Sequence, residues 1–212
     1  MARSWTWPTL LLAFVLLTRP AFAGAAPGDA RNQIGLTAGI EMIPSTTSGG
    51  VDLDFSNSVV FGVDYARRLP GGGSSRFYFE VPFSAAPHHS IDTASASTPG
   101  SMATLFVTPS FRVNFLPAAA VSPWVSVGAG YGLYQGSANL RDGTKNPSRF
   151  ASVVAFQWGG GIDIRTPMRI GVPVHLRFEA RDLYTLDSLD FNTGGSGEQH
   201  NVVVDAGILL LW

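Results

Sequence analysis

The chain has 212 residues, which suits a single domain, and its 14 basic and 15 acidic residues do not favour a nucleic-acid partner. Only 14% of the residues are charged, whereas 45% are hydrophobic and 24 are glycine. The chain has no cysteine, which excludes a disulfide scaffold, a thiolate metal site and a cysteine nucleophile.

The amino end predicts a secretory signal. Arg3 supplies a positive start, residues 10–17 form an apolar run too short to span a bilayer as a helix, and Ala21-Phe22-Ala23 is a cleavage site. We expect residues 1–23 to be removed, although an uncleaved N-terminal anchor is the alternative. A flexible periplasmic lead-in over residues 24–32 would then precede a barrel over residues 33–212. The mature chain keeps 12 basic and 15 acidic residues, a net charge of −3.

From Gln33 to the end, eight segments alternate apolar and polar residues with a period of two. This period indicates β-strands that each have one apolar face. Each segment has about 10–15 residues, the length that a tilted transmembrane strand needs. The expected strands are residues 33–42, 55–69, 76–86, 103–115, 123–135, 150–164, 172–184 and 200–212.

The connections between these strands alternate between long and short, and short turns opposite long external loops are typical of outer-membrane barrels. We therefore predict an all-β, eight-stranded, antiparallel up-and-down transmembrane β-barrel with both termini in the periplasm. A soluble lipocalin-like barrel is the alternative, but its outward face would be richly charged. Here the polar face is mostly Gly, Ser and Thr. The long connections are residues 44–54, 87–101, 136–149 and 185–199, and the short ones are 70–75, 116–122 and 165–171.

The last thirteen residues, HNVVVDAGILLLW, keep an apolar face as far as Trp212. In a soluble protein such a strand would be an exposed apolar edge that recruits other chains, whereas a closed membrane barrel turns this face to lipid. Asp205, Gly207, Leu210 and Trp212 resemble the C-terminal assembly signal of bacterial outer-membrane barrels. Leu210 departs from the aromatic preference of that signal. The resemblance implies that the barrel-assembly machinery recognises this chain.

The polar faces of the strands carry charged residues that we expect to point into the barrel. An eight-stranded barrel is just wide enough for side chains to fill, and buried charges must pair or lose their charge. We therefore predict a salt-bridged interior, centred on the seventh strand, rather than an open ion path. The residues of this predicted network are Glu41, Asp64, Glu80, Arg112, Asp163, Arg177, Glu179, Arg181 and Asp205.

Other clusters give weaker signals. His88, Ser90 and Asp92 could form an acyl-transfer triad, but adjacent residues in a predicted loop favour a solvated segment. The pair His88-His89 lacks a third metal ligand at a defined spacing, and His175 is expected to be a satisfied core histidine. Most strand aromatics fall on the apolar face and suit a lipid-facing band better than a sugar-stacking surface. We expect no catalytic, metal or cofactor site.

With these features, the chain resembles the small outer-membrane barrels of the OmpA N-terminal barrel, OmpW and OmpX groups. Residues 158–165 (WGGGIDIR) and 176–184 (LRFEARDLY) are similar to the penultimate hairpin of the outer membrane protein beta-barrel domain class. The resemblance implies a bacterial outer-membrane location, contact with membrane lipids and lipopolysaccharide, and a monomer.

The same resemblance implies a non-enzymatic structural, adhesive or protective role. A narrow conduit for small hydrophobic molecules is the first alternative. It would need an apolar pocket near the external rim and a lateral opening, for which Pro109 within the fourth strand is the one hint. A lipid A-modifying enzyme that uses the second long loop is the other alternative.

Overall fold

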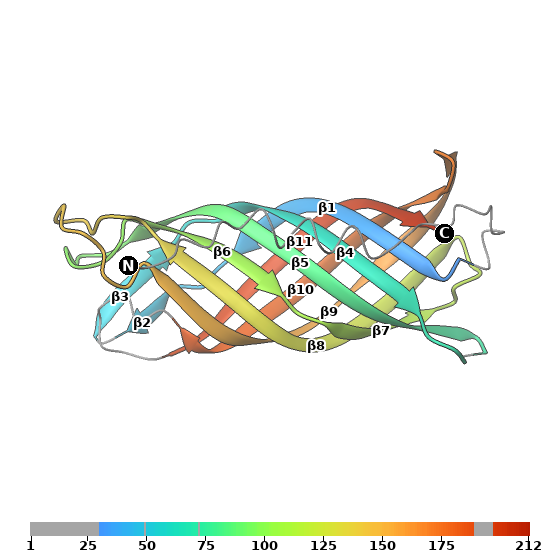
Figure 1. Ribbon diagram of the computed structural model, residues 1–212, viewed down its shortest axis with the longest axis horizontal. Helices are drawn as coiled ribbons and strands as arrows, with labels where there is room; N and C mark the ends of the chain where they lie inside the picture. The colour runs from blue at the N-terminus through green and yellow to red at the C-terminus, as the bar shows by residue number, and fades with distance from the viewer. Residues whose placement is uncertain (1–29, 49, 72, 189–196) are drawn as a thin grey trace, which may run out of the picture.

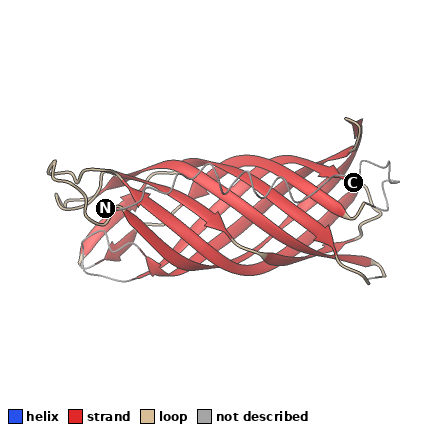
Figure 2. Cartoon of the chain, in the orientation of Figure 1, coloured by secondary structure: helices blue, strands red, loops and turns tan. Residues whose placement is uncertain are grey.

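The computed structural model describes residues 30–48, 50–71, 73–188 and 197–212 of the protein. The regular structure within these residues is β-strand (Figure 2), and none of them belongs to a helix long and apolar enough to cross a membrane. The predicted signal, residues 1–23, lies outside the described residues. The long strands are β1 (Asn32–Met42), β4 (Ser58–Arg68), β5 (Ser75–Asp92), β8 (Val121–Gly136), β9 (Phe150–Arg169), β10 (Pro173–Ser188) and β11 (Gly197–Leu211).

Two shorter strands, β6 (Ser101–Val107) and β7 (Ser110–Phe115), together make one further wall strand. Each wall strand pairs antiparallel with its neighbours, and β1 closes the ring on β11 from Gln33↔Leu211 to Met42↔Val202. The predicted eight-stranded antiparallel barrel is therefore confirmed. Figure 1 shows it as an elongated cylinder whose strands are inclined to the long axis.

Alternate residues of each strand face opposite sides of the wall, as the period of two predicts. On β11, for example, Val203 and Leu209 are buried, whereas Val204 between them is 46% exposed. A soluble barrel would turn its large apolar side chains inward, so an apolar belt around the outside is a lipid-facing surface. Exposed members of this belt include Phe61, Val63, Phe79, Phe111, Val127, Tyr131, Phe156, Trp158 and Phe178.

The ends of two strands differ from the prediction. The prediction ended the third strand at Ala86 because Pro87 follows, but β5 continues to Asp92. A register shift between Ala86 and His89 accommodates the proline as a local irregularity of the ladder. Similarly, β9 continues to Arg169 although the prediction ended it at residue 164. The first long connection also contains a hairpin, formed by β2 (Thr46–Ser48) and β3 (Val51–Phe55).

The short connections lie with the C-terminus at one end of the cylinder, and the β2–β3 hairpin lies at the other (Figure 1). At this second end, residues 93–100 and 137–149 pack on each other. Backbone amides of Arg141 and Asp142 donate to the carbonyls of Thr98 and Ala96 at 3.0 Å each, and Pro99 forms a bridge with Leu140. These two long connections therefore form one ordered surface.

Epitope tags inserted at glycine tips should report the orientation of the barrel. Gly143 and Gly71 both have a positive φ, and no atom lies within 4 Å of where a Cβ would be at either position. Both sites should thus accept an insertion. Because long loops face the outside in such barrels, antibodies should bind a tag at Gly143 on intact cells. A tag at Gly71 should react only after permeabilisation, and the reverse pattern would invert the orientation.

Candidate functional site in the barrel interior

The centre of the lumen is organised around an inward-facing tryptophan. Trp124 on β8 is 2% exposed. The guanidinium carbons of Arg112, Arg177 and Arg181 lie 5.5, 5.1 and 5.1 Å from the centroid of its ring. A cation is attracted to the face of an indole at such distances. Arg112 comes from β7 and the other two arginines come from β10, so three wall strands contribute to this cluster.

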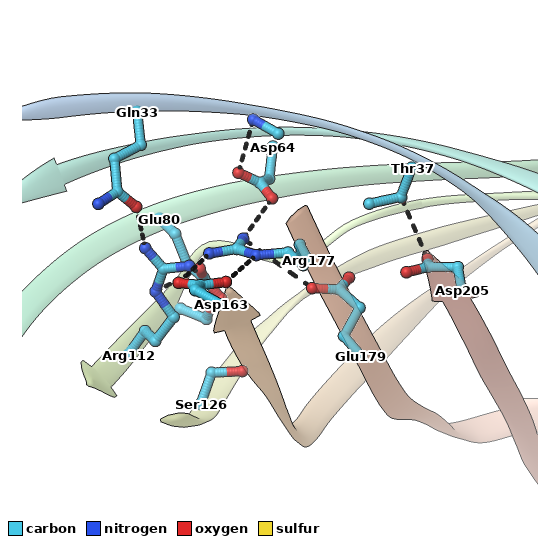
Figure 3. Close-up of polar contacts among 12 residues, drawn as sticks. Gln33, Thr37, Asp64, Glu80, Arg112, Ser126, Asp163, Arg177, Glu179 and Asp205 are labelled. Atoms are coloured by element: carbon cyan, nitrogen blue, oxygen red, sulfur yellow. Dashed lines mark hydrogen bonds and ion pairs between the residues drawn. The ribbon is translucent and has the colours of Figure 1, made fainter. Parts of the chain in front are cut away.

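Arg177 joins carboxylates from two different walls. Its Nε and Nη2 donate to the two oxygens of Asp163 on β9 at 2.8 and 3.1 Å, which is the paired geometry that a guanidinium favours. Its Nη1 donates across the lumen to Asp64 Oδ1 on β4 at 2.8 Å (Figure 3). The backbone amide of Gly35 donates to the other oxygen of Asp64 at 3.1 Å.

Arg181 repeats this arrangement further along β10. It donates from Nε and Nη2 to the two oxygens of Glu179 at 2.8 and 3.1 Å. Its Nη1 donates to Glu80 Oε1 on β5 at 3.0 Å. Glu80 also lies 3.3 Å from Arg112 Nε and accepts a hydrogen bond from Ser110. Glu80 therefore connects two arginines, and every charged group in this chain of contacts is buried.

The two remaining carboxylates of the predicted network lie apart from the arginines. Asp205 accepts a hydrogen bond from Thr37 Oγ1 at 3.1 Å, and its Oδ1 has no partner (Figure 3). Glu41 accepts a hydrogen bond from Thr104 at 2.6 Å and lies 3.6 Å from His89 Nε2. Because Arg177 Nη1 lies 3.9 Å from Glu179 Oε2, the structure brings seven of the nine predicted residues into one ion-paired group. Glu41 and Asp205 lie outside it and pair with neutral side chains or a histidine.

Apolar side chains fill the interior between this group and the long loops. The cluster includes Ile43, which follows β1, and Leu53 of the β2–β3 hairpin. A cavity beside Arg181 and a cavity beside His175 have volumes of about 20 and 30 Å³, and each has room for one or two waters. The other members of the cluster are Val60, Ala86, Ile91, Met102, Phe106, Tyr134, Val153, Ala155, Leu183 and Val203.

The wall is continuous at Pro109, where a lateral opening was one hypothesis. The pairs Phe83↔Val107 and Glu80↔Ser110 on either side of the proline keep the same register. The amide of Thr108 donates to the Pro82 carbonyl at 3.3 Å, and the amide of Ala129 donates to the Pro109 carbonyl at 3.2 Å. Proline removes donors from the ladder here, as its chemistry requires, but the neighbouring strands remain joined.

The histidines lie differently from their predicted places. His88, Ser90 and Asp92 belong to β5, and Ser90 Oγ lies 3.5 Å from His88 Nε2. Asp92 pairs instead with Arg141 at 3.4 Å, so these contacts do not assemble a triad. His175 lines the cavity at the short-connection end rather than the core. Among the described residues, no three His, Asp or Glu side chains are placed to hold a metal ion.

The residues of the predicted assembly signal lie along the seam between β11 and β1. Gly207 faces Thr37, and a Cβ there would overlap the carbonyl oxygen of Leu36, so the seam requires glycine at this position. Leu210 is paired with Ile34, and the Trp212 carbonyl accepts the backbone amides of residues 31 and 32 at 3.0 and 2.9 Å. Recognition of these residues by assembly machinery stays a prediction.

Sequence comparison and structure comparison give different answers for this chain. No protein-family model matches the sequence, and no curated protein is detectably similar to it. Solved structures do match. Neisserial surface protein A (NspA) has a TM-score of 0.53 at 13% identity, over 85% of this chain and 96% of that protein.

Two further solved structures align over most of their length. Ail, the attachment invasion locus protein of Yersinia pestis, has a TM-score of 0.46 at 16% identity, over 84% of this chain and 99% of Ail. The outer membrane enzyme PagL has a TM-score of 0.41 at 9% identity, over 82% of this chain and 97% of PagL. Together with the closed ring and the outer apolar belt, the likeness to NspA shows that this chain has the fold of the small bacterial outer-membrane β-barrels of the OmpA, OmpW and OmpX kind.

Proposed function

We propose that the protein is a closed, non-enzymatic outer-membrane barrel that holds an ordered external surface in place. The observation that carries this proposal is the filled interior. Three arginines surround Trp124 at the centre of the lumen, and an apolar cluster closes the interior towards the long loops. An eight-stranded barrel filled in this way acts as a rigid scaffold rather than a pore.

The long connections supply the part of the molecule that such a scaffold would present. Residues 93–100 and 137–149 are joined by backbone hydrogen bonds, and a guanidinium nitrogen of Arg141 donates to the Ile91 carbonyl. Loops that are fixed to each other and to the barrel have less conformational entropy to lose when a partner binds. This supports a role in surface interaction, with the partner unspecified.

The two alternatives have less support in the geometry. A conduit for small hydrophobic molecules would need an open apolar pocket near the external rim, where packed side chains such as Phe106 and Tyr134 lie instead. A lipid-modifying enzyme would need an acid that orients His88 beside Ser90. The nearby Asp92 is 85% exposed at its side chain and pairs with Arg141.

Planar-bilayer recording tests the closed interior directly. The wild-type protein should pass almost no current, because the ion-paired side chains around Trp124 and the apolar cluster fill the described lumen. Shortening Arg181 to Ser should produce measurable conductance by removing a side chain that spans to Glu80. Arg141→Ser, in an external loop, is the matched control and should leave the barrel closed. Large, steady conductance of the wild type would overturn the proposal.

A further inference from the structure

The end of the barrel with the short connections carries a concentration of arginine. We call the six arginines that the described residues place at this end the arginine rim. No Asp or Glu side chain belongs to the described residues 30–32, 66–71, 73–77, 114–123, 164–175 and 210–212. Asp163 lines a cavity with Arg76 and Arg165, but it is ion-paired with Arg177 in the interior. The members of the arginine rim are Arg31, Arg67, Arg68, Arg76, Arg165 and Arg169.

The opposite end of the barrel has a different charge balance. Its described side chains include the acids Asp52, Asp54, Asp92, Asp142 and Glu198 and the bases Arg141, Lys145 and Arg149. Acidic and basic side chains are therefore mixed at the long-loop end, whereas the members of the arginine rim are all basic. Because a one-sign cluster costs self-repulsion, a surface that retains it is suited to an anionic partner.

The position of the arginine rim relative to the lipid-facing belt indicates that lipid headgroups are the nearest anionic groups. Tyr65 and Arg67 are both outward-facing on β4, so Arg67 lies about 7 Å further along the strand than the last aromatic of the belt. Trp212 and Phe77 belong to the same end of the outer wall. Aromatic side chains at such a boundary mark the level of the lipid headgroups, and arginine stems extend from there towards the headgroups.

Exposed apolar side chains lie among the arginines on the short connections. Leu116 is 61% exposed, Met168 is 57% exposed and Ile170 is 66% exposed. The last two flank Arg169 in the hairpin between β9 and β10, which projects beyond the barrel (Figure 1). Basic residues mixed with apolar ones are typical of surfaces that rest on lipid, whereas a site for a soluble polyanion needs only the charges.

We propose that the arginine rim binds anionic phospholipid headgroups of the leaflet at the short-connection end of the barrel. The positive guanidinium groups are attracted to the net negative charge of these headgroups, and the apolar tips enter the interfacial layer. This inference requires a barrel that spans a membrane, but it does not depend on whether the lumen is closed. Conductance and lipid preference therefore test the two proposals separately.

Quenching by brominated lipids can measure this preference, because Trp212 reports on the rim. The full-length protein with Trp5→Phe, Trp7→Phe and Trp158→Phe, purified from membranes, is placed in vesicles that contain brominated phosphatidylglycerol or brominated phosphatidylcholine. Trp124 is buried in the lumen and out of reach of lipid. Since a cationic side chain near an anionic surface gains about five-fold in binding, quenching should show a preference of about five-fold or more for phosphatidylglycerol at low salt.

The variant Arg67→Gln, Arg165→Gln, Arg169→Gln should reduce this preference to within about two-fold, and lysine at the same positions should retain most of it. Heat-modifiable migration verifies that each variant is folded. The matched control is Arg141→Gln, Lys145→Gln, Arg149→Gln at the other end, which should behave as the wild type. Equal binding of the two lipids by the wild type, or loss of the preference only in the control, would overturn the inference.

Discussion

Replacement of Arg177 by Met should lower the free energy of unfolding by about 3–5 kcal/mol, the usual cost of breaking a buried ion pair. Arg177 is fully buried and holds both oxygens of Asp163 and one oxygen of Asp64. Methionine fills much of the same space but offers no donor, so two carboxylates lose their partner at once. Urea unfolding of the protein in lipid vesicles, followed by tryptophan fluorescence, measures the change.

Matched variants separate this effect from a general loss of packing. Lys145→Ala, in an exposed loop, should change the free energy of unfolding by less than about 0.5 kcal/mol. If the orphaned carboxylates cause the loss, adding Asp163→Asn to Arg177→Met should cost much less than the sum of the two single changes. Purely additive costs, or a cost for Arg177→Met as small as that of Lys145→Ala, would contradict a tightly paired interior.

The sequence predicts which side of the wall each charged residue occupies because the side-chain period of a strand is two. It also predicts neighbours on a hairpin, since a short connection fixes the register of the two strands. Asp163 is paired with Arg177 in this way across the short β9–β10 connection, whereas Glu179 is paired with Asp205 although a long connection separates β10 from β11. Because the interior of an eight-stranded ring is small, these inward-facing charges are expected to contact one another.

Contacts across the lumen lie beyond this reasoning. The pairing of Arg177 with Asp64 joins β10 to β4, which are not neighbours in the ring. Which residues meet there depends on how far the strands are staggered around the closed barrel. The alternation of apolar and polar residues along a strand does not give this stagger. For the same reason, the prediction did not anticipate that Asp205 would bond to Thr37 rather than to an arginine.

Some strand ends were predicted less well, as at the third strand, where the predicted loop began at Pro87. Pro87 lies at an exposed position where β5 shifts its register, so pairing resumes beyond it and His89 becomes buried. A backbone N–H that points away from the neighbouring strand makes no hydrogen bond to it, so its replacement by proline costs little stability. The polar composition of residues 87–90 favoured a loop, and no alternation of apolar and polar residues marks them as a strand.

Trp124 was missed for a different reason. The sequence interpretation considered charged residues for the interior, so the tryptophan at the start of the predicted strand 123–135 was given no role there. Yet Trp124 lies on the same face of the strand as Ser126, which points inward. Three glycines further along that face and two on β9 leave space in the lumen. A Cβ at Gly161 would overlap the indole itself, so this glycine makes room for the ring.

Trp124→Ala should therefore destabilise the barrel by about 3–5 kcal/mol, the usual cost of removing a large aromatic from a packed core. The indole Nε1 has no hydrogen-bond partner, so the loss arises from the cavity and from the three guanidinium groups that lie near the ring. Trp124→Phe keeps an aromatic face and should recover about half of the loss. Urea unfolding in vesicles gives both values.

Trp158→Ala is the matched control, because Trp158 is 44% exposed on the outer wall and contacts Tyr184 and His200. Lipid replaces the lost surface there, so the cost should be about 1 kcal/mol or less. Without the indole, water can also reach the arginines, and Trp124→Ala should conduct ions in a planar bilayer where Trp158→Ala does not. Equal stability losses for the two alanine variants, with no current through either, would show that the indole is not what holds the centre of the barrel together.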